Sequence, residues 1–241
     1  METSATNKHI LIHAAAERLM GNPLHYSQEL PRRCLQLIDE LWPHASNTLQ
    51  KDRPELGALT TTFLISMSMP IINLPLERIE QHRSSKKPAY ANDRAIAPAL
   101  TDEVDKILGG QVLERAPFYE TGSWRFAKHA PFNVAEGLSE ELVDSLSGDA
   151  AVKRASKMQT SQWCRILRNA MAHGGIAYLD INGRTSHGVS VDGYAFVSGV
   201  YDEKRGLIEV NVLRISEIHY RNFLRKWVGW LESPEVRKVS A

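Results

Sequence analysis

The chain has 241 residues, of which 43% are hydrophobic and 24% are charged, and its formal net charge is +1. This composition is typical of a globular protein that is long enough to bury a sizeable core. The near-zero net charge excludes binding to a polyanion through overall charge, so any nucleic-acid site would have to be a local basic patch.

The cysteine content and the apolar segments favour a cytoplasmic protein. The two cysteines, Cys34 and Cys164, lie far apart in apolar runs, as expected of buried thiols in a reducing compartment. No signal peptide is evident, because residues 1–8 are polar. The most apolar run, 59–75, contains several Thr and Ser residues and Pro70, and we expect it to be too short and too interrupted to span a bilayer.

Helical patterns fill the first part of the chain. Apolar residues recur at helical spacing over 9–20 and 31–42. A third helix is predicted to start at Asp52–Glu55, where an N-cap aspartate precedes a proline, and to end or kink at Pro70. Residues 74–82 are predicted to add a short helix.

The next segment, 81–99, reads QHRSSKKPAYANDRAIAPA and is basic and proline-containing. It is typical of a solvated loop, and the alternative is a flap in which Lys86 and Lys87 contact phosphates. Further helices are predicted over 101–108, 140–146 and 149–173, the last with a break near residues 160–161. The signals in 111–134 are mixed and predict no element.

The pattern changes after Gly174 and Gly175. Residues 176–181 read as a strand followed by an Asn-Gly turn, and 193–213 as two strands around a turn at 202–206. Ser216 is then predicted to open a final helix with one buried stripe. We therefore predict a mainly α fold in a single domain, 1–241, with a helical body (8–174), a small antiparallel β meander (175–213) and a C-terminal helix (215–232) that packs back on the body.

One stretch, CRILRNAMAHGG (164–175), carries the candidate chemistry. On a helical wheel the apolar side chains of 163–171 gather on one side, whereas Arg165, Arg168, Asn169, Ala172 and His173 occupy the other. Asn169 and His173 are one turn apart, and Arg168 and His173 flank the small Ala172. This spacing fits either a shallow ligand-binding trough or an ordinary solvated helix face, and spacing alone does not separate the two.

The string LRNAMAHG, Leu167–Gly174, resembles the signature of the HEPN superfamily, in which an arginine and a polar residue are followed by three variable residues and a histidine. The resemblance covers the motif and the helical body before it, but not the β meander. It implies a helical-bundle fold, a homodimer in which two motifs face one cleft, and a metal-independent endoribonuclease of the toxin or phage-defence type, restrained by an antitoxin or another regulatory protein. No cofactor is implied.

The residue types suit this chemistry. Histidine transfers protons near neutral pH, and arginine presents a permanently charged fork to phosphate oxygens. We therefore expect Arg168, Asn169 and His173 to be catalytic, with Asn169 orienting His173 or contacting phosphate, and Arg165, Lys86 and Lys87 to bind RNA phosphates. The expected products are a 2′,3′-cyclic phosphate and a 5′-hydroxyl.

Two alternatives stay open. The first is a non-catalytic HEPN-like module that binds a nucleotide or a partner protein through the same residues. The second is a metal enzyme, which the nine histidines suggest but which no HExxH or paired CxxC pattern supports. His129 is a candidate second imidazole, although the pattern favours an ordinary loop histidine.

Overall fold

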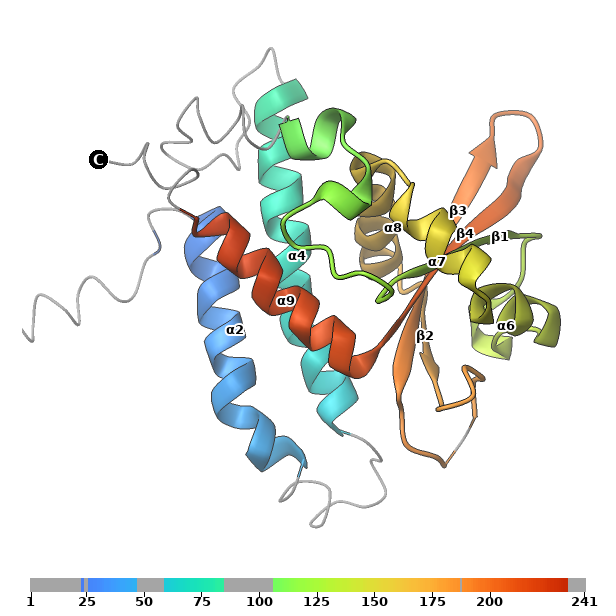
Figure 1. Ribbon diagram of the computed structural model, residues 1–241, viewed down its shortest axis with the longest axis horizontal. Helices are drawn as coiled ribbons and strands as arrows, with labels where there is room; N and C mark the ends of the chain where they lie inside the picture. Colours follow the sequence, from blue (N-terminus) through green and yellow to red (C-terminus); the bar gives the residue numbers. More distant parts are fainter. Residues whose placement is uncertain (1–22, 24–25, 47–58, 85–105, 187, 234–241) are drawn as a thin grey trace, which may run out of the picture.

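The computed structural model describes residues 23, 26–46, 59–84, 106–186 and 188–233. Its main elements are α2 (Tyr26–His44), α4 (Leu59–Ser84), β1 (Arg125–His129), α6 (Glu140–Ser147), α7 (Asp149–Ser156), α8 (Thr160–Ala172), β2 (Ile176–Leu179), β3 (Gly193–Asp202), β4 (Gly206–Ser216) and α9 (Glu217–Leu231). In Figure 1, α2, α4 and α9 pack together beside the sheet, and α8 lies between α4 and β3. The predicted helix at 9–20 and the predicted helix start at Asp52–Glu55 fall outside the described residues.

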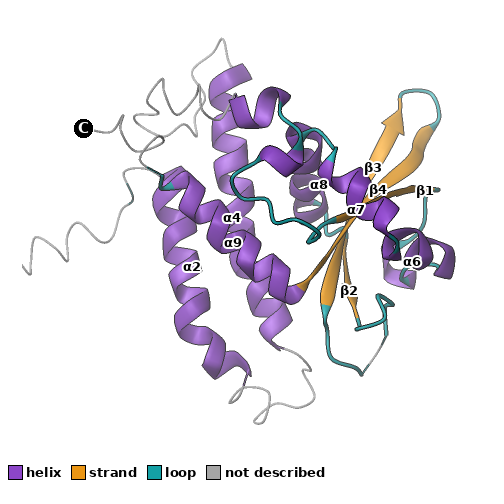
Figure 2. Cartoon of the chain, viewed as in Figure 1, coloured by secondary structure: helices purple, strands orange, loops and turns teal. Residues whose placement is uncertain are grey.

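The prediction of a mainly α fold with a small β meander is wrong. The protein is mixed α/β, with a four-stranded antiparallel sheet in the order β1-β4-β3-β2 (Figure 2). The predicted meander supplies three strands, and β1 comes from the unassigned part of the expected helical body. The pairing of β1 with β4 joins residues that are 81 to 89 positions apart, from His129 opposite Val210 to Arg125 opposite Arg214. Such long-range pairing stabilises a five-residue strand whose local pattern is weak.

The sheet separates two hydrophobic clusters. One face packs against α8 and α9 through Phe126, Tyr194, Phe196, Leu213 and Ile215. The other face packs against Leu142 and Leu146 of α6 through Ala127, Ala177, Leu179, Ala195, Val197, Val210 and Val212. Because both faces are covered, the first six residues of β3 are all buried and read as one continuous run.

Several local predictions are confirmed. The helix predicted at 140–146 is present as α6, and Ser216 opens α9 through a side chain that accepts a backbone N–H, as Ser139 does for α6. The break near residue 160 separates α7 from α8. The stripe on the last helix is buried, at Tyr220, Leu224, Trp227 and Leu231.

Helix α4 does not end at Pro70, which was one of the two outcomes predicted there. It continues through Pro70 and Pro75 to Ser84 and includes the separate short helix predicted at 74–82. A proline inside a helix removes the N–H that would bond to the carbonyl four residues earlier. For Pro70 that carbonyl belongs to Ser66, which is exposed and accessible to water. For Pro75 it belongs to Ile71, which is fully buried.

The unpaired carbonyl of Ile71 has a substitute donor. The indole nitrogen of Trp227, on α9, donates to this oxygen over 2.9 Å in a buried hydrogen bond. A bond from another helix thus replaces the one that Pro75 deletes, and this satisfies the buried carbonyl where local sequence rules predict a helix end.

By length and composition alone, the Leu59–Arg78 part of α4 could cross a membrane. Neither proline breaks the helix, so the run is longer and less interrupted than expected, and the expectation that it does not span a bilayer stays a prediction. Its Leu64, Ile71 and Ile72 side chains are fully buried inside the protein. A core helix of a soluble protein has this character, and the cytoplasmic location stays a prediction.

The Trp227 bond predicts a specific stability difference. Trp227→Phe should lower the free energy of unfolding by about 1–3 kcal/mol more than Trp230→Phe, because only the first leaves a buried carbonyl unpaired. Trp230 is a matched control: it is also buried on α9, and among the described residues its indole nitrogen has no hydrogen-bond partner. Urea unfolding of both variants measures the difference, and equal losses would contradict the assignment.

The same bond predicts coupling between Trp227 and Pro75. In a Pro75→Ala background the new N–H can bond to the Ile71 carbonyl, so Trp227→Phe should cost about 1 kcal/mol less than it does beside Pro75. A double-mutant cycle on unfolding free energies measures this. Strict additivity would show that the two residues act independently.

Candidate functional site

Helix α8 is held by one strongly buried face. Trp163, Cys164, Ile166, Leu167, Ala170 and Met171 are buried, whereas Arg165, Ala172 and His173 are exposed and Arg168 and Asn169 are half-buried. The predicted two-sided helix is therefore confirmed. The Trp163 ring lies at its centre, with the rings of Trp124, Phe223 and Phe118 at centroid distances of 5.1, 5.2 and 5.6 Å.

The helix ends in a tight glycine cap. Gly174 has a φ of 71°, and the Gly175 N–H bonds to the Ala170 carbonyl over 2.8 Å, which is a Schellman arrangement. Gly175 also lies directly against β3, and a Cβ at this position would overlap the carbonyl oxygen of Val197. The two glycines therefore fix where His173 leaves the helix.

Arg168 is engaged with α4. Its Nε lies 3.3 Å from a carboxylate oxygen of Glu77, and its backbone carbonyl lies 3.5 Å from the Asn73 side-chain amide. Asn73 and Glu77 are one turn apart, so they present a polar face to α8. The Arg168 side chain is 22% exposed and that of Glu77 is 49% exposed, so solvent reaches the pair. Sequence analysis missed Glu77 because the predicted end of α4 separated it from the main helix.

Asn169 and His173 lie on the sheet side of the motif. The Asn169 amide donates to the Ser198 hydroxyl of β3 over 3.4 Å. His173 is exposed at the end of α8, and its imidazole makes no hydrogen bond to the residues that the structure describes. The amide of Asn169 thus contacts the sheet and not the imidazole, so the expected orienting role of Asn169 toward His173 is not what this geometry shows.

The predicted phosphate-binding residues are only partly described. Arg165 is exposed on α8, one turn before Arg168 and Asn169, so it extends the same polar face. Lys86 and Lys87 lie outside the described residues. The structure therefore brings Arg165, Arg168, Asn169 and His173 together on one helix, with Glu77 added from α4.

The candidate second imidazole, His129, has local partners at the end of β1. Its Nδ1–H donates to the Ala130 carbonyl over 2.8 Å, Nε2 lies 3.5 Å from the Ser139 hydroxyl, and the ring meets Phe132 edge-on. These contacts explain His129 as a residue that orders its own loop. Within the described ranges, no three His, Cys, Asp or Glu side chains form a group that could hold a metal ion.

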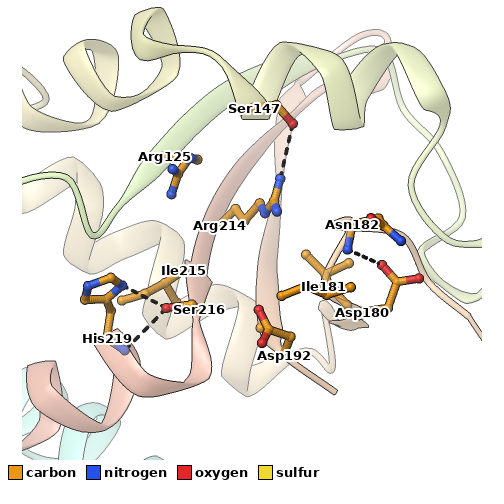
Figure 3. Close-up of a pocket in the computed structure, with 12 residues that line it drawn as sticks. Arg125, Ser147, Asp180, Ile181, Asn182, Asp192, Arg214, Ile215, Ser216 and His219 are labelled. Carbon is orange, nitrogen blue, oxygen red and sulfur yellow. Dashed lines mark hydrogen bonds between the residues drawn. The ribbon is translucent and has the colours of Figure 1, made fainter. Parts of the chain in front are cut away.

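A second polar site lies at the other end of β2. A pocket of about 400 Å³ is lined by Arg125, Ser147, Asp180, Asp192, Arg214 and His219, among others (Figure 3). Sequence analysis missed it because β1 was not assigned, and only the pairing of β1 with β4 places Arg125 beside Arg214. The sequence signal for this pocket was an arginine within an apolar run, which occurs twice: Arg125 in WRFA (124–127) and Arg214 in VLRI (212–215).

Comparisons with protein-family models, with curated proteins and with solved structures give no match. The resemblance of Leu167–Gly174 to the HEPN signature therefore stays a prediction that depends on these residues alone.

The close approach at the cap predicts different costs for its two glycines. Gly175→Ala should lower the free energy of unfolding by about 1–3 kcal/mol or more, because the new methyl group meets a backbone oxygen that cannot rotate away. Gly174→Ala is the matched control: it has open space around it and should cost about 1 kcal/mol from its positive φ. Chemical denaturation compares the two, and a Gly175→Ala variant that is as stable as wild type would contradict the packing.

Proposed function

We propose that this protein is a metal-independent endoribonuclease in which Arg168 and His173 form the catalytic pair. The observation that supports this most strongly is the end of α8. There a solvent-exposed imidazole and a partly exposed guanidinium share a polar helix face, and the packing of the opposite face and the glycine cap hold that face in place. Rigid support of this kind is what a phosphate-cleaving site needs.

The proposed reaction needs only proton transfer and charge stabilisation. The 2′-hydroxyl oxygen attacks the neighbouring phosphorus as a base removes its proton, and the bond to the 5′ oxygen breaks as an acid protonates that oxygen. The products are a 2′,3′-cyclic phosphate and a 5′-hydroxyl. Histidine is suited to either proton transfer, and the guanidinium stabilises the charge that develops on the phosphorane oxygens.

One α8 helix provides one such imidazole. His173 is exposed beside Ala172 and Gly174, which carry almost no side chain, so a second copy of the chain can bring its own His173 close to the same phosphate. We therefore propose a homodimer with a composite site. Arg165 would extend the phosphate-binding surface, and the restraint by an antitoxin or a regulatory protein is part of the same proposal.

One contact favours the alternative of a non-catalytic binding module. The Arg168 guanidinium pairs with Glu77, and a carboxylate competes with any phosphate for the same fork. The partial exposure of the pair keeps this competition weak, because exposed ion pairs contribute only about 0.2–1 kcal/mol.

The catalytic assignment predicts that His173→Ala and Arg168→Ala each slow RNA cleavage by about 10²–10⁴-fold while the fold is kept. His44→Ala is the matched control, since His44 is also an exposed histidine at the C-terminal end of a helix, in this case α2. Cleavage of labelled RNA in EDTA measures the rates. Unchanged cleavage by both variants, or loss of wild-type activity in EDTA, would contradict the mechanism.

The Glu77 contact predicts the opposite change in substrate affinity. Glu77→Gln should strengthen RNA binding by about 2- to 5-fold, because the Glu77 carboxylate no longer competes with phosphate for the Arg168 guanidinium. Glu141→Gln removes the same charge at an exposed position on α6 and controls for the general electrostatic effect. Equal gains in the two variants, measured by fluorescence anisotropy, would show that Arg168 does not contact the RNA.

A further inference from the structure

The pocket at the end of the sheet contains two arginines at adjacent positions. Arg125 of β1 and Arg214 of β4 are direct cross-strand partners, so their side chains leave the same face of the sheet. Like charges at directly opposed positions destabilise a sheet. Among the described residues, no carboxylate oxygen lies within 4.0 Å of either guanidinium. The fold therefore brings two cations together without a close ion pair to either of them, although Asp180 and Asp192 line the same pocket.

The Arg214 guanidinium is half-buried and held in position. It donates to the Ser147 hydroxyl over 3.4 Å, and it packs flat against Gly183, where a Cβ would lie only 2.6 Å from the guanidinium atoms. Burial, together with the charge of Arg125, lowers the pKa of Arg214, and the negative charges of Asp192 and Asp180 offset this only in part. The positive charge is thus costly for the protein by itself, and an anion in the pocket would offset that cost.

The turn that forms one wall of the pocket is also fixed. The Asp180 carboxylate accepts from the Asn182 and Arg184 backbone N–H groups and from the Ser186 hydroxyl. Arg184 then joins this turn to α6 through two bonds to Glu140, of 2.8 and 2.6 Å. The lone pairs of Asp180 are therefore largely used within the turn, so Asp180 acts on Arg214 through its charge and forms no ion pair with it.

Asp192 faces the arginines differently. In Figure 3 it lies below Arg125 and Arg214, across the pocket, and among the described residues its carboxylate accepts no hydrogen bond. The Ser216–His219 corner at the start of α9 closes a further side, with the Ser216 hydroxyl 2.8 Å from His219 Nδ1. The pocket thus has a cationic wall and a free carboxylate acceptor opposite it.

We propose that this pocket binds a small phosphate monoester that carries hydroxyl groups, with the phosphate on Arg125 and Arg214 and a hydroxyl donated to Asp192. A phosphate monoester carries about −1.5 to −2 charge and three acceptor oxygens, which match two guanidinium forks, whereas a carboxylate neutralises only one. The volume of about 400 Å³ suits a ligand of nucleotide or sugar-phosphate size. The inference does not depend on the proposed RNA cleavage, because the pocket lies apart from Arg168 and His173.

Isothermal titration calorimetry on the full chain tests the proposal with AMP, ribose 5-phosphate, inorganic phosphate and adenosine. The two esters should bind saturably, inorganic phosphate should bind more weakly, and adenosine should not bind. Arg125→Gln and Arg214→Gln should each weaken ester binding by about 10- to 100-fold. Arg205→Gln, an exposed arginine in the β3–β4 turn, controls for the lost charge and should change nothing.

Two further measurements keep the proposal open to disproof. Asp192→Asn should reduce the preference for ribose 5-phosphate over inorganic phosphate, and Arg125→Gln should unfold at the same or a higher temperature than wild type without ligand. Binding should survive in His173→Ala. Failure of both esters to bind, equal binding to wild type and both arginine variants, or binding only of long RNA through these arginines would overturn the proposal.

Discussion

The structure depends on the burial of one face of α8. Trp163 and its neighbours must leave water, and the aromatic cluster that receives them is built from α9 and from the segment before β1. Such ring pairs add to the stabilisation that burial alone provides. Because the apolar face is turned into this cluster, the polar face of the same helix is directed along α4 and toward the edge of β3. The positions of Arg168, Asn169 and His173 follow from that single constraint.

The same constraint explains why the molecule has two separate polar regions. The helices cover one face of the sheet, where Asn169 meets Ser198, and α6 covers the other, where Arg214 meets Ser147. The first region is the exposed end of α8, where the Arg168 guanidinium pairs with Glu77. The second is a pocket in which two adjacent arginines form no close ion pair with any described carboxylate, and in which Asp192 lies opposite them. The two regions therefore suit different ligands. The exposed end of α8 suits an extended chain such as RNA, and the pocket suits a compact anion.

The sequence predicted those parts of the structure in which local rules operate. Residues within a few positions of each other determine five of these parts. They are the two sides of α8, the glycine cap of α8, the break before α8, the β3–β4 hairpin and the Ser216 cap. The parts that were wrong depend on distant partners. β1 exists because β4 pairs with it, and α4 passes Pro75 because Trp227 satisfies the carbonyl of Ile71. Glu77 and the Arg125–Arg214 pair were missed for the same reason, and the roles of the predicted site residues stay proposals.

The most direct test of the central claim is the chemistry of the RNA ends that the wild-type protein produces in EDTA. Cleavage by Arg168 and His173 through the neighbouring 2′-hydroxyl predicts 2′,3′-cyclic phosphate and 5′-hydroxyl ends, which mass spectrometry of the fragments distinguishes. The same RNA incubated with His173→Ala should stay intact. Fragments that end in a 3′-hydroxyl and a 5′-phosphate, or no fragments from the wild-type protein, would contradict the account.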